Sequence, residues 1–114
     1  MNILLINHYA GHPECGMEFR PYYLAQKWIE KGNKVLIVAA NFSHLRKKNK
    51  SMLNDFEYEN IKGIDYLWIK TPEYKTNRLD RLKNILTFVR KLKKRAKQIA
   101  IDFKPDAVIA SSTY

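Results

Sequence analysis

The 114-residue sequence has little cysteine and no segment typical of export or membrane insertion. Cys15 is the single cysteine, which excludes an internal disulfide and fits a reducing compartment. The first apolar run has no basic residues before it and no small-residue cleavage site, so a signal peptide is not indicated. No run approaches the roughly 18 apolar residues of a membrane span. We therefore expect a cytoplasmic protein with at most peripheral membrane contact.

Several catalytic signatures are also absent. The loop after the first apolar run is not G-x-G-x-x-G, and it has no P-loop lysine. There is no G-x-S-x-G elbow, and no Cys/His set has the spacing of zinc ligands. We therefore expect no metal, and the motifs assign no catalytic residue.

Acidic residues are scarce: 11 Asp and Glu stand against 21 Lys and Arg, for a net charge of +10. Ten basic residues and only Asp80 as an acid lie between Lys75 and Lys97. Such a helix face suits anionic lipid head groups or nucleic acid phosphates, although a solvated face is an equal alternative. The candidate membrane-facing residues are Arg90, Lys91, Lys94, Arg95 and Lys97.

The apolar pattern predicts an α/β fold. Residues 2–7, 34–40 and 106–110 are continuous apolar runs, typical of strands buried in a parallel sheet. Residues 17–31 have helical spacing, with Pro21 near the first turn, and complete a βαβ unit. Residues 56–60 and 64–71 indicate a small hairpin insertion that turns at Lys62 and Gly63.

A long helix is expected over residues 79–103. Its apolar residues recur at steps of three and four, and we expect this stripe to face the core. The stripe comprises Leu82, Ile85, Leu86, Val89, Leu92, Ala96, Ile99 and Phe103.

These elements predict a Rossmann-like parallel sheet with flanking helices, in the strand order 3-2-1-4. Ligands of such sheets bind at the carboxyl ends of the strands. The loops at residues 8–16, 41–50 and 111–114 follow those ends, and we expect the three loops to meet.

The first loop has two interpretations. Gly11 and Gly16 precede a helix, where free amides attract phosphate, but glycines at such a place often serve only the turn. His8 ends the first strand, as a general base or as a hydrogen-bonded cap. In the second loop, Arg46, Lys47, Lys48 and Lys50 favour an anionic substrate.

Four segments together resemble a known family. They are INHYAG-x-PE-x-GMEFRPYYLA-x-x-W from Ile6, VLIVAA-x-FSHLR from Val35, IDYLWIKTPEY from Ile64 and KPDAVIASS from Lys104. This pattern is similar to the amino-terminal part of the family 4 glycosyltransferases with the GT-B fold. It is nearest to the subgroup that transfers amino sugars such as N-acetyl-fucosamine in O-antigen or capsule assembly.

The resemblance implies a protein with two Rossmann-like domains. The first handles the acceptor, here a lipid-linked glycan, and the second holds the nucleotide-sugar donor, here a UDP-sugar, with an E-x-seven-E signature. The transfer is of the retaining type, without an essential metal or other cofactor, at the inner membrane face. Residues 1–114 correspond to an incomplete first domain, so we expect this piece alone to be inactive and to self-associate through its sheet edge.

Site roles follow from the resemblance by position. The donor-phosphate side of the cleft is assigned to Gly11, Gly16, Met17, Glu18 and Arg20, and the acceptor side to His8, His44, Arg46, Ser111 and Ser112. We expect no nucleic acid partner. The alternatives are a small basic α/β module that binds nucleic acid or another polyanion, and an α/β partner of a separate donor domain.

Overall fold

A computed structural model describes residues 1–75 and 78–111. Within these residues the chain forms one five-stranded sheet and two helices. In chain order the elements are β1 (Asn2–Asn7), α1 (Arg20–Glu30), β2 (Lys34–Ala40), β3 (Phe56–Ile61), β4 (Ile64–Ile69), α2 (Arg78–Phe103) and β5 (Ala107–Ser111).

The sheet has the order β3-β4-β2-β1-β5. The four strands β4, β2, β1 and β5 are parallel, and β3 runs antiparallel at one edge. The predicted order of the parallel strands is therefore confirmed, with β5 beside β1. The hairpin of β3 and β4 is not an insertion, because β4 pairs with β2 as a full member of the sheet.

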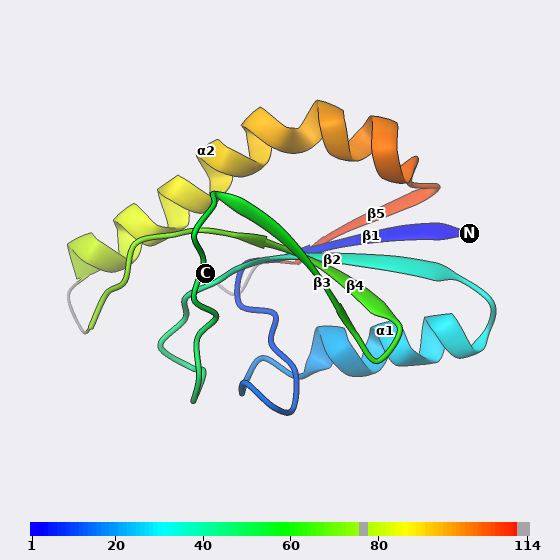
Figure 1. Cartoon of the computed structure of the whole chain (residues 1–114), viewed down its shortest axis with the longest axis horizontal. Coiled ribbons are helices and arrows are strands. Elements are labelled where there is room, and N and C mark those ends of the chain that lie inside the picture. Colours follow the sequence, from blue (N-terminus) through cyan, green and yellow to red (C-terminus); the bar gives the residue numbers. More distant parts are fainter. Residues whose placement is uncertain (76–77, 112–114) are drawn as a thin grey trace.

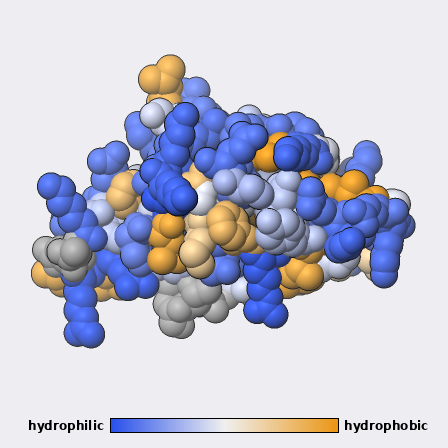
Figure 2. Space-filling model, turned by 90° about the horizontal axis from the view of Figure 1, so that it is seen from below, coloured by the Kyte–Doolittle hydropathy of each residue, from blue (hydrophilic) through white to orange (hydrophobic). Residues whose placement is uncertain are grey.

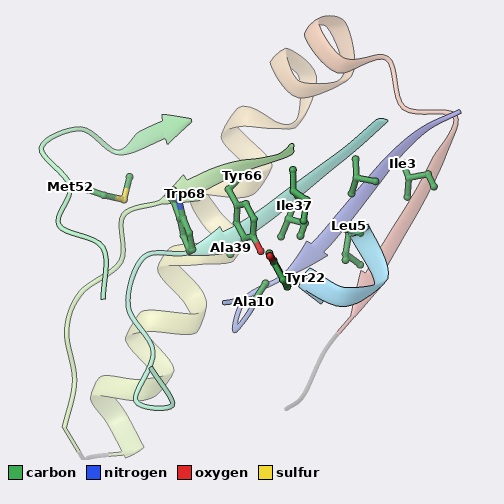
Figure 3. Packing of buried hydrophobic residues seen from close by; sticks show 12 residues of the cluster. Ile3, Leu5, Ala10, Tyr22, Ile37, Ala39, Met52, Tyr66 and Trp68 are labelled. Atoms are coloured by element: carbon green, nitrogen blue, oxygen red, sulfur yellow. The ribbon is translucent and has the colours of Figure 1, made fainter. Parts of the chain in front are cut away.

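The two helices cover opposite faces of the sheet (Figure 1). Tyr22 and Ala25 of α1 pack with Leu5, Ile37 and Tyr66, among others, on one face (Figure 3). Phe88 and Ile99 of α2 pack with Leu4, Leu36, Val38, Leu67 and Ile69 on the other. Successive residues of a strand point to opposite faces, so the continuous apolar runs serve both cores.

The predicted core stripe of α2 was partly wrong. Phe88 and Ile99 face the sheet, but so does the polar Asn84, which is fully buried. Ile85, Leu92 and Phe103 are half-buried, whereas Leu82, Leu86 and Val89 are 49%, 58% and 42% exposed. Asn84 has buried polar partners on this face, so the polar atoms of its own side chain are hydrogen-bonded despite their burial.

The surface on the side of α1 is mostly hydrophilic, with small separate hydrophobic patches (Figure 2). Among residues 1–75 and 78–111, no helix has both the length and the apolar content needed to cross a membrane.

Candidate functional site

The loop between β1 and α1 is held by its own backbone. The amide of Gly11 donates to the Glu18 carbonyl at 2.8 Å, and the amide of Glu18 donates to the Tyr9 carbonyl at 2.9 Å. The Gly16 amide donates to the His12 carbonyl at 2.9 Å. These three amides are already used, so the predicted phosphate contact finds no free donor among them.

Close packing explains why both of these loop positions are glycine. A Cβ on Gly11 would lie 2.0 Å from the Gly16 carbonyl oxygen. Gly16 has φ +112, and a Cβ there would lie 2.7 Å from the Lys47 amide nitrogen. Gly11 therefore lets the loop after β1 close on itself, and Gly16 lets it approach the loop after β2, which agrees with the turn interpretation of the pattern.

Arg46 joins these two loops. Its Nη1 donates to the Ala40 carbonyl and its Nη2 to the Ala10 carbonyl, both at 2.6 Å. Its guanidinium carbon lies 5.1 Å from the centre of the Trp68 ring. The Lys48 amide also donates to the Cys15 carbonyl at 3.0 Å. The predicted meeting of the first two loops is confirmed, and a single buried arginine links them.

A cavity of about 360 Å³ opens where the two loops meet β3 and β4. It has the size of small-molecule sites and combines basic, acidic and aromatic side chains. It is lined by His12, Glu14, Cys15, Arg46, Lys48, Asn49, Lys50, Ser51, Glu59 and Trp68.

A second polar cluster lies at the same edge of the sheet, on the side of α2. Asn84 Nδ2 donates to Thr71 Oγ1 at 3.0 Å and to the Pro72 carbonyl at 2.7 Å. Its Oδ1 is therefore an acceptor, and the short contact with His8 Nε2 assigns the proton to that nitrogen. Burial lowers the pKa of His8 to about 4, so the ring is neutral at pH 7.

Two further contacts connect this cluster to α2 and to the second loop. Arg81 Nη2 donates to Tyr9 Oη at 3.0 Å, which places the first turns of α2 beside the loop after β1. His44 is exposed and has its Nδ1 at 2.6 Å from Tyr74 Oη; partial desolvation by its neighbours, together with the charge of Arg81, lowers its pKa. The carboxyl edge therefore holds a neutral histidine, tyrosines and cations close together.

The structure brings together only some of the predicted site residues. Arg46 lines the cavity, whereas His8 is buried in the Asn84 cluster and His44 lies near Tyr74. Met17 and Arg20 are exposed and Glu18 is half-buried, and none of the three lines the cavity. Ser111 pairs with Asn7 at the end of β5, and Ser112 lies outside the described residues.

The prediction that five basic residues of α2 face outward is only partly correct. Arg90, Lys94 and Lys97 are exposed, as expected. Lys91 instead pairs with Asp55 at 2.9 Å, and the guanidinium carbon of Arg95 lies 4.9 Å from the centre of the Phe56 ring. These two side chains bend toward the sheet because their helix positions adjoin the buried face.

The outer face of α2 changes from mainly apolar to basic along its length, with Lys83 as an exposed basic residue in the first half. We use this name for Leu79, Leu82, Leu86 and Val89 in the first half and Arg90, Lys93, Lys94 and Lys97 in the second, all of them exposed. The apolar half lies beside the carboxyl edge of the sheet, as the contact of Arg81 with Tyr9 shows. This face combines apolar contact with positive charge, which suits an interfacial helix.

Sequence reasoning missed Asn84, Trp68, Glu14 and Glu59 as site residues. An asparagine four residues before Phe88, on a helix with buried neighbours, was the available signal for Asn84. Trp68 gave no separate signal because it also belongs to the core (Figure 3). Among residues 1–75 and 78–111, no group of three or more His, Cys, Asp or Glu is placed to hold a metal ion.

The fold and the cavity define an α/β protein with a charged site at the carboxyl edge of a mostly parallel sheet. No family model, curated protein or solved structure matches the chain.

Proposed function

We propose that the chain is the acceptor-side domain of a GT-B glycosyltransferase that acts in surface-polysaccharide assembly. The observation that carries this proposal is the charged cavity at the carboxyl edge of the sheet, the same edge beside which the first turns of α2 lie on the opposite face. A lipid-linked acceptor needs both features: a polar site for its sugar and a surface for the bilayer. The sequence resemblance supplies the reaction type.

In this proposal the enzyme transfers a sugar from a UDP-sugar to a hydroxyl of the lipid-linked glycan. A donor-binding domain supplies the nucleotide site, so the 114-residue chain binds acceptor without transferring sugar. The loops after β1 and β2 hold the acceptor glycan, and the outer face of α2 holds the domain at the inner membrane face. About 1 kcal/mol per basic residue is available from anionic lipid.

The experiment is a titration of the ¹⁵N-labelled chain with a short-chain polyprenyl diphosphate-linked N-acetyl sugar. We expect amide shifts in residues 8–16 and 41–51 and in the first turns of α2. The matched control ligand is the polyprenyl diphosphate without sugar, which should shift α2 alone. Absence of shifts in both loops with the sugar-bearing ligand would refute the acceptor role.

A polyanion-binding module is the second candidate, because four exposed basic residues lie in the second half of the outer face of α2. Tyr66 and Trp68 are buried and offer no stacking surface, whereas Tyr23 and Tyr58 are each 53% exposed. Filter binding with single-stranded and duplex DNA over a salt series separates the two candidates. The glycosyltransferase proposal predicts weak binding at physiological salt, whereas tight binding with a steep salt slope would favour the polyanion module.

A further inference from the structure

The cavity contains a buried positive charge without an ionic partner. Arg46 is only 7% exposed, and its two terminal nitrogens donate to neutral carbonyl groups. Among residues 1–75 and 78–111, no carboxylate lies within ion-pair distance of it. Burial lowers the pKa of Arg46 to about 10, which leaves the guanidinium charged at neutral pH. A buried charge of this kind is costly unless a counter-charge approaches it.

Two residues that line this cavity each have a buried nitrogen without a hydrogen-bond partner within the described part of the chain. These nitrogens are Nε of Arg46 and Nδ1 of His12, and His12 is only 8% exposed. Burial lowers the pKa of His12, so at neutral pH one ring nitrogen carries a proton and the other is an acceptor. Buried polar atoms are nearly always paired, so two polar side chains that line one cavity and are not fully satisfied within the chain point to a ligand there.

The other lining charges limit what that ligand is. Lys48 and Lys50 add positive charge, and Glu14 and Glu59 add negative charge. Lys50 already pairs with Glu59 at 3.4 Å. The cavity therefore has a small positive excess, which suits one anionic group better than a polyanion. The carboxylates of Glu14 and Glu59 are acceptors for hydroxyl groups.

We propose that this cavity binds a sugar that carries one oxyanion, either a carboxylate or a phosphate ester. The oxyanion lies against the Arg46 guanidinium with His12 and Lys48 around it, and sugar hydroxyls donate to Glu14 and Glu59. The oxyanion site follows from the cavity itself. Its assignment to an acidic sugar of the acceptor glycan rests on the proposed function.

The test is a titration of the ¹⁵N-labelled 114-residue chain with four probes: glucuronate, glucose 6-phosphate, glucose and inorganic phosphate. We expect the two acidic sugars to shift amides of residues 12–16 and 46–51, and the difference between them identifies the anion. Glucose should bind at least about ten-fold more weakly, since a hydrogen-bonded charge is worth about 1.5–3 kcal/mol. No shifts with either acidic sugar, equal binding of glucose, or binding of inorganic phosphate as tight as that of both sugars would overturn the proposal.

Two substitutions at the cavity and one control substitution on α2 make the test specific. Lys48→Gln removes an exposed charge at the cavity and should weaken glucuronate or glucose 6-phosphate binding about three- to five-fold, whereas Lys97→Gln, the matched charge change on α2, should not. His12→Ala should weaken binding about ten-fold. If His12→Ala does not fold, Lys48→Gln decides alone, and equal effects of Lys48→Gln and Lys97→Gln would overturn the site.

The outcome is separable from that of the proposed function. The acidic sugars carry no lipid, so they report on the oxyanion site even if the polyprenyl-linked ligand fails to bind. Conversely, binding of the polyprenyl-linked sugar without any response to the acidic sugars would keep the acceptor role and reject this substrate class.

Discussion

His8 couples the stability of the fold to pH. Its pKa of about 4 in the folded protein is below the usual 6.5, because burial disfavours the charged ring more strongly than the hydrogen bond with Asn84 favours it. The unfolded chain therefore binds a proton more readily between pH 6.5 and 4. Stability from this group is complete above pH 6.5 and is lost as the pH falls toward 4, by up to about 3 kcal/mol.

We predict that His8→Gln reduces this acid sensitivity. Glutamine keeps an N–H donor for the Asn84 oxygen but does not titrate. Urea unfolding at pH 7 and at pH 4.5 measures the change, with His12 and His44 common to both proteins. An identical loss of unfolding free energy in wild type and variant would show that His8 is not the responsible group.

Gly16 is needed for space as well as for conformation. Gly16→Ala brings a Cβ to 2.7 Å from the Lys47 amide nitrogen, at φ +112. Gly63 is the matched control, since it has φ +88 but nothing within 4 Å. We predict a loss of about 1 kcal/mol for Gly63→Ala and about 3 kcal/mol or more for Gly16→Ala, measured by chemical denaturation. Equal losses would mean that the loops do not pack as described.

Single residues of the site were predicted unevenly. Arg46 was selected as a cleft residue, but its burial was not foreseen, because an arginine in a run with Lys47 and Lys48 has the pattern of a solvated loop. Its role depends on the carbonyl group of Ala10, in the loop after β1, and on that of Ala40, at the end of β2. Such long-range partners leave no periodic signal in the sequence.

At the scale of helices and strands, the hydrophobic pattern of the sequence predicted most of the element boundaries. β1 and β2 have the predicted bounds, and α2 begins one residue before the prediction. Helix α1 begins at Arg20 rather than residue 17, because Met17 and Glu18 belong to the loop that closes on Tyr9 and Gly11. Hydrophobic period alone does not separate a loop from a first helical turn.

The rotation of α2 can be tested with one substitution on each face. Phe88 is 3% exposed in the core, and Leu86 is 58% exposed on the outer face. We predict that Phe88→Ala lowers the free energy of unfolding by about 3–4 kcal/mol and that Leu86→Ala lowers it by less than about 1 kcal/mol. If a denaturant titration shows a larger loss of unfolding free energy for Leu86→Ala than for Phe88→Ala, the core-facing stripe predicted from the sequence would be correct instead.

The outer face of α2 should bind anionic vesicles through both of its halves. Replacing Lys93 and Lys97 by Gln removes about 2 kcal/mol of attraction, or about thirty-fold in partitioning to vesicles with phosphatidylglycerol. Replacing Leu82 and Leu86 by Ser should weaken binding to the same vesicles without removing its salt dependence. The Lys62→Gln variant, in the turn between β3 and β4, is the control. If the Lys62→Gln variant loses as much vesicle binding as the α2 variants, the binding arises from the net charge of the protein and not from α2.

At the scale of the whole molecule, the two edges of the sheet differ. The β3 edge has Glu57 and Glu59 along its length, and charged residues discourage pairing with another chain. The β5 edge has the sequence AVIAS, with Val108 57% and Ile109 40% exposed. This edge is therefore the place where a second copy can add strands.

We predict concentration-dependent association through β5. Sedimentation velocity of the 114-residue chain should show dimers or larger species that Val108→Lys reduces, because lysine on an edge strand opposes pairing. Tyr58→Lys on the opposite edge is the matched control, at 53% exposure. A monomer at all accessible concentrations, or equal effects of the two lysines, would rule out this edge.

The sheet order was also predictable as a whole, because right-handed crossovers leave few arrangements of four parallel strands. The position of the cavity, in contrast, could not be predicted from the sequence. The reversal of strand order places the expected crevice between β1 and β5, whereas the cavity lies over β4, where Arg46 and Trp68 meet. The position of the cavity depends on side-chain packing between the loops after β1 and β2, and the strand order does not determine that packing.

The most direct test of the acceptor role uses Cys15, the one thiol of the chain, which lines the cavity and is half-buried. The rate of its alkylation by iodoacetamide at pH 8 is measured with increasing polyprenyl diphosphate-linked sugar, and separately with a DNA oligonucleotide. We predict that the sugar-bearing ligand slows alkylation saturably and that DNA does not. An unchanged rate with the sugar-bearing ligand, or protection by DNA alone, would contradict an acceptor site in this cavity.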